Sequence, residues 1–414
     1  MKYVINSSVP LRGSINISGA KNSAIKILAA SLLCDQEIIL ENPPNTLDVK
    51  NFIALLQETG IFVDIKSDGR VALNAKDANS FEIPKEAKYI KPSTFLIGPL
   101  LARFGKAILP KNPSFKIDLY LDVLKTLGVK VSEKSTFYKF ESASLSGFNI
   151  NFEKNTPTGT DIAILLAVTA NGTTTITNAA EEPEIDDLIQ FLTKVGANVK
   201  MGIENPREIT VEGVRYLSGG FYSVIPDRNE TAFYISSAIF TNGDIVIKNC
   251  NPSHLTAFLS KLNLLGAGYE VTAKDELRVW CDEKTVLNPV NIETRVYPGF
   301  AEDFQALFSV LLTKAKGTSI VKETEFEGGF DFAKELNGMG AGIEIGREQM
   351  EIKGPVMLKG ARVQADGIIS GTALIVAGLG AKGKTEVLGA EIIDNSFEDI
   401  IGKLASLGAV IKKV

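Results

Sequence analysis

The chain has 414 residues, of which 45% are hydrophobic and 22% are charged, and its formal net charge is −5. This length exceeds what one ordinary hydrophobic core supports, so two domains or an array of repeats are expected. The acidic balance disfavours a general nucleic-acid binder, which presents a basic face, but leaves room for a local cationic pocket.

The three cysteines, Cys34, Cys250 and Cys281, are far apart in the sequence and form no CxxC pair. Neither a disulfide framework nor a metal site is therefore expected, and a reduced cytoplasmic setting is favoured. The first residues lack the apolar region of a signal peptide, and apolar runs such as 160–170 are too short to span a bilayer. We therefore expect a cytoplasmic protein with no nucleic-acid or membrane partner.

A helical pattern that closes on a glycine recurs along the chain. The closing glycines are Gly60, Gly128, Gly196, Gly266, Gly340 and Gly408. Their separations are 68, 68, 70, 74 and 68 residues, and this near-constant spacing indicates six copies of one unit. Each glycine is expected to adopt the left-handed backbone conformation that a Cβ atom disfavours.

Each copy combines the same kinds of element. An apolar helix, as in residues 22–33 or 160–170, precedes a short β-rich run such as 173–177. An amphipathic helix and a β-branched strand such as 409–411 follow. One such unit leaves apolar helix and sheet faces uncovered, so the copies must associate into an α/β fold. The spacing alone allows one ring or two groups of three, and the length favours two lobes.

Four segments carry a resemblance to a known family. Residues 17–24, Ile-Ser-Gly-Ala-Lys-Asn-Ser-Ala, are similar to the opening signature of the UDP-N-acetylglucosamine 1-carboxyvinyltransferases. Residues 98–105, 178–185 and 226–231 are similar to further stretches of the same proteins. The chain therefore resembles the enolpyruvyl transferase family over essentially its whole length. The shikimate-pathway members share the architecture, but their opening motif fits residues 17–24 less well.

The resemblance implies a specific architecture. Two inside-out α/β barrel lobes of three units each are expected, with a cleft between them. One lobe would comprise residues 1–20 plus 229–414, which contains both termini, and the other residues 21–228. The resemblance also implies closure of the lobes on a UDP-sugar, and neither a metal nor a cofactor.

The family reaction joins the enolpyruvyl group of phosphoenolpyruvate to a sugar hydroxyl and releases phosphate. Anionic substrates require converging cations, preferably bidentate arginines, together with a base and an acid. By resemblance, Lys21 contacts phosphate and Asp303 acts on the sugar hydroxyl, so both are candidate catalytic residues. The candidate substrate-binding residues are Asn22, Lys88, Lys91, Lys116, Asp118, Lys154, Thr156 and Arg228.

The sequence departs from the family pattern where cations are required. The loop at 109–119 lacks two residues of the family's mobile loop, the cysteine (sometimes an aspartate) that serves as the acid and the arginine that follows it. Arginines are also missing from 327–330, 365–369 and 394–400, where Asp399 adds a negative charge. Each charge-assisted hydrogen bond contributes roughly 1.5–3 kcal/mol, so losing three or four costs on the order of 5–10 kcal/mol.

Three hypotheses follow. The first is a divergent protein that binds a UDP-sugar or another small phosphorylated ligand, with the standard transfer weak or lost. The second is an active transferase with an altered substrate, which would use a new cation cluster around Lys88, Lys91, Lys111 and Lys116. The third is a regulatory or structural protein without small-molecule chemistry. The sequence leaves the ligand and the oligomeric state open.

Overall fold

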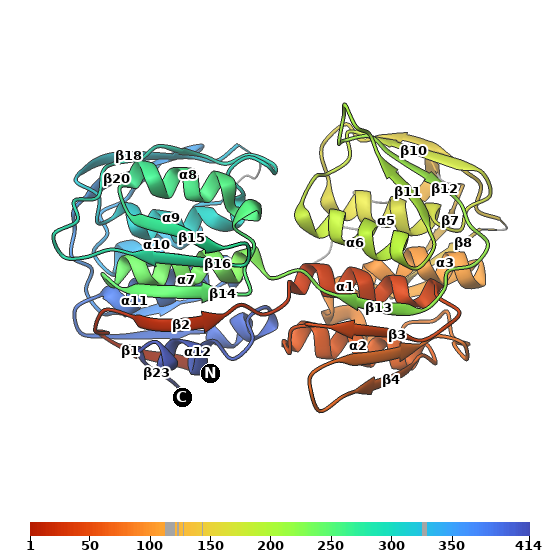
Figure 1. Cartoon of the computed structure of the whole chain (residues 1–414), viewed down its shortest axis with the longest axis horizontal. Coiled ribbons are helices and arrows are strands. Elements are labelled where there is room, and N and C mark those ends of the chain that lie inside the picture. The colour runs from red at the N-terminus through yellow and green to blue at the C-terminus, as the bar shows by residue number, and fades with distance from the viewer. Residues whose placement is uncertain (112–120, 122–123, 127, 143, 325–328) are drawn as a thin grey trace. The chain divides into compact units, whose positions relative to one another are not determined.

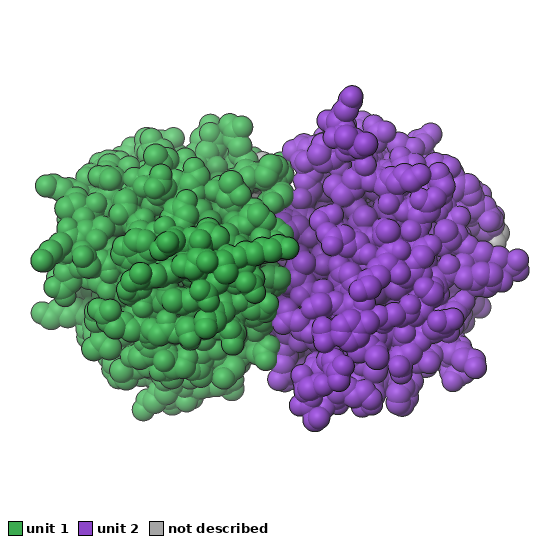
Figure 2. Space-filling view, in the orientation of Figure 1, with its two compact units in different colours: residues 1–18, 226–414 green, residues 19–225 purple. Residues whose placement is uncertain are grey.

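The computed structural model describes residues 1–111, 121, 124–126, 128–142, 144–324 and 329–414, apart from the side chain of Lys91. It divides into two compact units, residues 1–18 with 226–414 (unit 1) and residues 19–225 (unit 2), coloured separately in Figure 2. Backbone hydrogen bonds are consistent with divisions after Ser18 and after Ile225. Asp227 N–H donates to Ser18 O within unit 1, whereas Ala20 N–H donates to Ile225 O within unit 2.

Unit 1 contains three four-stranded sheets around buried helices (Figure 1). The strand orders are β21-β22-β1-β23, β15-β16-β14-β2 and β17-β18-β20-β19. The strands are β1 (Lys2–Asn6), β2 (Arg12–Asn16), β14 (Asp244–Lys248), β15 (Gly268–Ala273), β16 (Glu276–Trp280), β17 (Ile292–Glu293), β18 (Gly317–Lys322), β19 (Glu344–Ile345), β20 (Gln349–Gly354), β21 (Arg362–Gln364), β22 (Lys384–Leu388) and β23 (Val410–Lys413). The helices are α7 (Arg228–Phe240), α8 (Thr256–Leu265), α9 (Gln305–Leu312), α10 (Asp331–Gly338), α11 (Ile368–Gly380) and α12 (Ile400–Ser406).

Unit 2 repeats this plan. Its sheets have the orders β11-β12-β10-β9, β13-β3-β5-β4 and, in the described residues, β6-β8-β7. The strands are β3 (Ile38–Glu41), β4 (Phe62–Ile65), β5 (Val71–Asn74), β6 (Lys106–Pro110), β7 (Lys130–Glu133), β8 (Phe137–Glu141), β9 (Asn149–Asn151), β10 (Thr173–Thr177), β11 (Asn198–Met201), β12 (Ile209–Glu212) and β13 (Gly220–Ser223). The described helices are α1 (Lys21–Ala30), α2 (Leu47–Glu58), α3 (Ile97–Phe104), α5 (Pro157–Ala167) and α6 (Pro183–Lys194).

The repeats share one strand pattern. In five of the six sheets a central strand pairs with a parallel neighbour on one side and an antiparallel neighbour on the other, as β14 does with β2 and β16. The closing glycines confirm the predicted left-handed turns, since Gly60, Gly128, Gly196, Gly266, Gly340 and Gly408 have φ of 87°, 72°, 104°, 89°, 92° and 98°. These turns reverse the chain from each outer helix into the next strand.

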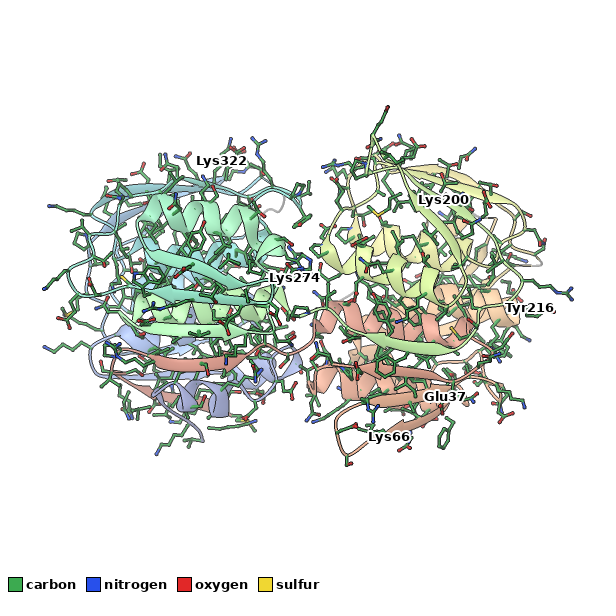
Figure 3. All side chains as sticks on the ribbon, in the orientation of Figure 1. Glu37, Lys66, Lys200, Tyr216, Lys274 and Lys322 are labelled. Carbon is green, nitrogen blue, oxygen red and sulfur yellow. The ribbon has the colours of Figure 1, made fainter. Side chains whose placement is uncertain are left out.

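Each unit is inside out, because its most buried helices lie at its centre. Every residue of α9 is buried, as is every residue of α7 except Asn229, and α7, α9 and α11 pack against one another. Charged side chains such as Lys200 and Lys322 extend outward from the sheets (Figure 3). None of the helices described has the length and apolar character needed to cross a lipid bilayer.

Candidate functional site

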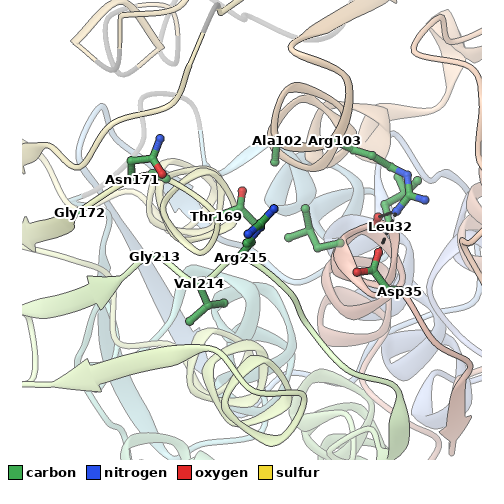
Figure 4. Close-up of a pocket in the computed structure, with 12 residues that line it drawn as sticks. Leu32, Asp35, Ala102, Arg103, Thr169, Asn171, Gly172, Gly213, Val214 and Arg215 are labelled. Atoms are coloured by element: carbon green, nitrogen blue, oxygen red, sulfur yellow. Dashed lines mark hydrogen bonds and ion pairs between the residues drawn. The ribbon is translucent and has the colours of Figure 1, made fainter.

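The three central helices of unit 2 end at one cavity of about 480 Å³ (Figure 4). Its wall includes Leu32 after α1, Arg103 in the last turn of α3 and Thr169 after α5. The Arg103 guanidinium donates to Leu32 O at 3.0 Å and to Ala75 O at 2.6 Å. Helix C-termini carry partial negative charge, so this end is a poor site for an anion. Arg103 instead donates hydrogen bonds to backbone carbonyl groups.

The opposite ends of these helices bring candidate residues together. Lys21 and Asn22 are the first residues of α1, and Thr156 is the N-cap of α5, accepting from Gly159 N–H at 3.2 Å. In the second turns of the two helices, Lys26 Nζ lies 2.8 Å from Asp161 Oδ2. Lys21, Asn22 and Thr156 therefore lie at one end of unit 2, where the partial positive charge of the helix N-termini favours an anion.

Lys21 is oriented by a neighbouring helix. Its Nζ lies 3.1 Å from Asp48 Oδ2, and the two side chains are 14% and 21% exposed. Asp48 lies in the first turn of α2, where Thr46 is the N-cap. The ion pair holds the lysine in place while the ammonium group stays close to solvent, and Asn22 beside it is exposed.

A buried carboxylate lies behind this end of unit 2. Asp187 of α6 accepts hydrogen bonds from the Ser23 hydroxyl, from Tyr222 OH at 2.6 Å and from Ile225 N–H at 3.5 Å. Burial raises the pKa of Asp187, whereas the hydrogen bonds from Ser23 and Tyr222 lower it. This network attaches the first turn of α1 to the last residue of unit 2.

In unit 1 the candidate residues gather at the start of α7. Arg228 is its first residue and is buried, with its guanidinium carbon 5.3 Å from the ring centre of Tyr297 and 5.9 Å from that of Phe304. Asn229 Nδ2 donates to Asp303 Oδ2 at 3.1 Å. Asp303 lies in the 3-10 turn Glu302–Phe304 that leads into α9. This contact brings the starts of α7 and α9 together.

A second buried carboxylate lies one residue further along α7. Glu230 accepts from Ser18 N–H at 2.8 Å and pairs with Lys403 Nζ of α12 at 2.5 Å. Lys403 also donates to the Ser18 hydroxyl at 2.6 Å. Burial raises the pKa of Glu230 to about 7, against the opposing effect of Lys403. Lys403 is therefore already paired with Glu230. It also contacts Ser18, the last residue of the segment 1–18 of unit 1.

The remaining candidates are less well placed. Lys88 is half-buried with its Nζ 4.7 Å from the ring centre of Tyr89, and Lys154 is exposed before α5. Lys91 begins the 3-10 segment Lys91–Leu96, but its side chain lies outside the described part of the structure. Lys116 and Asp118 also lie outside the described residues.

Two described residues at the divergent positions, Lys111 and Asp399, serve local structure. Lys111 pairs with Glu133 at 2.5 Å. Asp399 is the N-cap of α12 and accepts from Gly402 N–H at 3.1 Å. Residues 327 and 328 lie outside the described residues.

Sequence reasoning did not identify Asp48, Asn229 or the pair Lys26–Asp161. Asn229 directly follows Arg228 in the family-like stretch 226–231, which was a usable signal. Asp48 and Asp161 are distant in sequence from the lysines that they contact, and no local sequence pattern predicts these ion pairs.

A family model described as EPSP synthase (3-phosphoshikimate 1-carboxyvinyltransferase) matches residues 5–404. The chain belongs to this enolpyruvyl transferase family. The predicted family and its α/β fold are therefore confirmed. A structure titled as the enolpyruvyl transferase NikO from Streptomyces tendae has a TM-score of 0.91 and 21% identity, covering 99% of this chain and 98% of that one. An EPSP synthase from Acinetobacter baumannii has a TM-score of 0.78 and 17% identity, covering 100% of both chains.

Curated members of the family are more similar in sequence. UDP-N-acetylglucosamine 1-carboxyvinyltransferase 1 of Legionella pneumophila is 38% identical, and the alignment covers 100% of this chain and 82% of that protein. The protein named UDP-N-acetylglucosamine 1-carboxyvinyltransferase 1 in Carboxydothermus hydrogenoformans is also 38% identical, with 100% of this chain and 98% of that protein covered. This chain is therefore similar to these two proteins over its own full length.

Proposed function

We propose that this member of the enolpyruvyl transferase family binds UDP-N-acetylglucosamine, or a closely related nucleotide sugar, and that its phosphoenolpyruvate-dependent transfer is weak or lost. The observation that carries the binding proposal is the start of α1, where Lys21 is fixed by Asp48 at 3.1 Å beside the exposed Asn22. An oriented ammonium group at a helix N-terminus suits a phosphate. The names of the relatives support a UDP-sugar as the source of that phosphate.

The transfer step places a larger demand on the protein. The sugar hydroxyl must lose a proton while its oxygen bonds to carbon 2 of phosphoenolpyruvate and carbon 3 gains a proton. Loss of phosphate and of a proton from carbon 3 then restores the double bond. Asp303, oriented by Asn229, is the candidate acceptor of the hydroxyl proton. The carboxylate and the phosphate of phosphoenolpyruvate both need cations throughout.

Three described cations already contact other protein groups, which phosphoenolpyruvate would have to replace. Lys403 is paired with Glu230, and Lys111 with Glu133. Arg228 is buried against two aromatic rings. A lysine also cannot reproduce the bidentate fork of a guanidinium group. The main support for weak transfer is the set of arginines missing from the family pattern, with a penalty on the order of 5–10 kcal/mol for three or four missing charge-assisted bonds.

The second candidate function is active carboxyvinyl transfer with an altered substrate or cation set. Full-length identities of 36–38% to proteins named for this activity favour it. It requires a new cation cluster that includes Lys91 and Lys116. If Lys91→Ala and Lys116→Ala leave ligand binding unchanged, this candidate loses its basis. A non-catalytic regulatory or structural role ranks third, because the retained residues gather at helix starts.

The test of binding is calorimetry with UDP-N-acetylglucosamine. We expect a saturable heat of binding for the wild-type protein and a weaker one for Lys21→Ala. The absence of binding at millimolar ligand would contradict the proposal. A cytoplasmic location is part of the proposal, and the three free, buried cysteines are compatible with it.

A further inference from the structure

Two opposite charges are buried between central helices of unit 2. Lys26 lies in the second turn of α1 and Asp161 in the second turn of α5, with Nζ and Oδ2 2.8 Å apart. The side chains are 6% and 0% exposed. Their sequence neighbours Ile25, Ile27 and Ile162 are core residues. The pair is therefore almost completely removed from water.

Stability alone does not account for this pair. Removing two charges from water is costly, and replacing a buried ion pair with apolar side chains of similar volume is often neutral or stabilising. Both carboxylate oxygens of Asp161 are buried, and in the described part of the chain neither accepts a hydrogen bond of ordinary geometry, although Oδ2 lies 2.8 Å from Lys26 Nζ. A buried ion pair that is not fully satisfied suggests a role in fixing geometry.

The pair joins the two helices that carry residues assigned to the ligand. Asn22 precedes Lys26 by four residues, so the two side chains emerge from the same face of α1. Thr156, the N-cap of α5, precedes Asp161 by five residues, somewhat more than one helical turn. The ion pair therefore joins α1 and α5 about one helical turn from the residues at their starts.

We propose that Lys26 and Asp161 form a positioning pair, which aligns the starts of α1 and α5 so that Lys21, Asn22 and Thr156 converge on the anionic part of a nucleotide sugar. The inference rests on the proposed function. Neither residue contacts the ligand, and both act through the helices that carry the residues that do. Replacing the pair should therefore weaken ligand binding even in a variant that folds normally.

Protonation of Asp161 gives the pair a measurable signature. Burial raises the pKa of Asp161 to about 6, and the nearby charge of Glu184 on α6 adds to this, whereas Lys26 opposes it. Below that pH Asp161 becomes neutral and the ionic contact is lost. A nucleotide sugar keeps its diphosphate ionised over this range, so a change in affinity reports on the protein.

The first experiment replaces both charges at once. Calorimetry with UDP-N-acetylglucosamine and thermal unfolding are measured for wild type and for Lys26→Met/Asp161→Leu. We expect the double variant to be folded, with an unchanged or higher Tm, and to bind at least about tenfold more weakly. The matched control is Arg207→Met/Glu181→Leu, which removes a more exposed pair of unit 2 at 2.7 Å and should keep wild-type affinity.

The outcomes separate the two proposals. Wild-type affinity in the folded Lys26→Met/Asp161→Leu variant overturns the positioning role and leaves the proposed function intact. If the wild-type protein itself does not bind the nucleotide sugar, the proposed function falls and the positioning role falls with it.

A second experiment needs no replacement of the pair. The affinity of wild type is measured from about pH 7.5 to about pH 5.5, and we expect it to fall several-fold as Asp161 is protonated. Asp161→Asn cannot titrate at this position, so it should lose the part of the fall that belongs to Asp161 and keep only what other groups such as Glu230 contribute. A flat wild-type profile, or parallel profiles for both proteins, contradicts the inference.

Discussion

Arg103 in unit 2 and Lys314 in unit 1 perform the same task at equivalent positions. Arg103, in the last turn of α3, donates to Leu32 O after α1 at 3.0 Å. Lys314, just after α9, donates to Phe240 O at the end of α7 at 3.2 Å and to Asn242 Oδ1 at 2.6 Å. In each unit a basic side chain at or just after the end of the second central helix donates to a backbone carbonyl at the end of the first. Within each unit, helix C-termini therefore lie at one end and the candidate ligand-binding residues at the other.

This relationship predicts a stability effect without a binding effect. Arg103→Met leaves two partly buried carbonyls without their donor and should lower the free energy of unfolding by about 1–3 kcal/mol. Urea unfolding is the measurement, with calorimetry to show that affinity for UDP-N-acetylglucosamine is kept. The control is Arg215→Met, an exposed side chain of the same cavity, which should change stability by at most about 0.5 kcal/mol. Equal effects of the two substitutions would argue against the assigned role.

Lys21 is predicted to contribute directly to ligand affinity. Lys21→Ala removes a charge-assisted contact of roughly 1.5–3 kcal/mol, so UDP-N-acetylglucosamine should bind about 10- to 100-fold more weakly. Asp48→Asn keeps the ammonium group but weakens its orientation, and a smaller loss is expected. Calorimetry measures both, with the exposed Lys50→Ala on α2 as the control. Equal affinities for Lys21→Ala and Lys50→Ala would remove Lys21 from the site.

Glu230 predicts a specific pH dependence of stability. Its pKa is about 7 in the folded protein and lies near 4.5 in the unfolded chain. The folded state therefore binds more protons between these values, so the contribution of Glu230 to stability falls as pH rises from about 4.5 to about 7. The expected loss is on the order of 1–3 kcal/mol. Comparing denaturant unfolding of wild type and Glu230→Gln at both ends of this window isolates the effect. A difference that does not change with pH would contradict it.

A pair of glycines tests the turn that ends each repeat. Gly340 has φ +92° and Gly338 lies within α10, and a Cβ atom at either position meets nothing within 4 Å. Gly340→Ala should therefore cost about 1–2 kcal/mol through backbone strain alone. Gly338→Ala should instead stabilise by about 0.5–1 kcal/mol, because alanine favours the helix. Thermal unfolding of the two variants checks the opposite signs, and equal signs would show that conformation is not the cause.

The repeated elements were predictable from sequence because they depend on local patterns. The strand predicted at 173–177 is β10, and the apolar helix predicted at 22–33 appears as α1 followed by the 3-10 turn Ser31–Leu33. Long-range pairs were not predictable in this way. Asn229 and Asp303 are 74 residues apart, and Lys26 lies within the otherwise apolar stretch 24–30 of α1, with no local sign of its partner Asp161. Periodicity identifies which face of a helix is buried, but not which distant charge meets it.

The measurement that most directly tests weak or lost transfer is phosphate release with saturating UDP-N-acetylglucosamine and phosphoenolpyruvate, after calorimetry has shown that the nucleotide sugar binds. We expect binding, with phosphate release at least several thousand-fold below ordinary enzyme rates of about 1–1,000 per second. Turnover within that ordinary range would contradict it and would show that other cations hold the phosphoenolpyruvate.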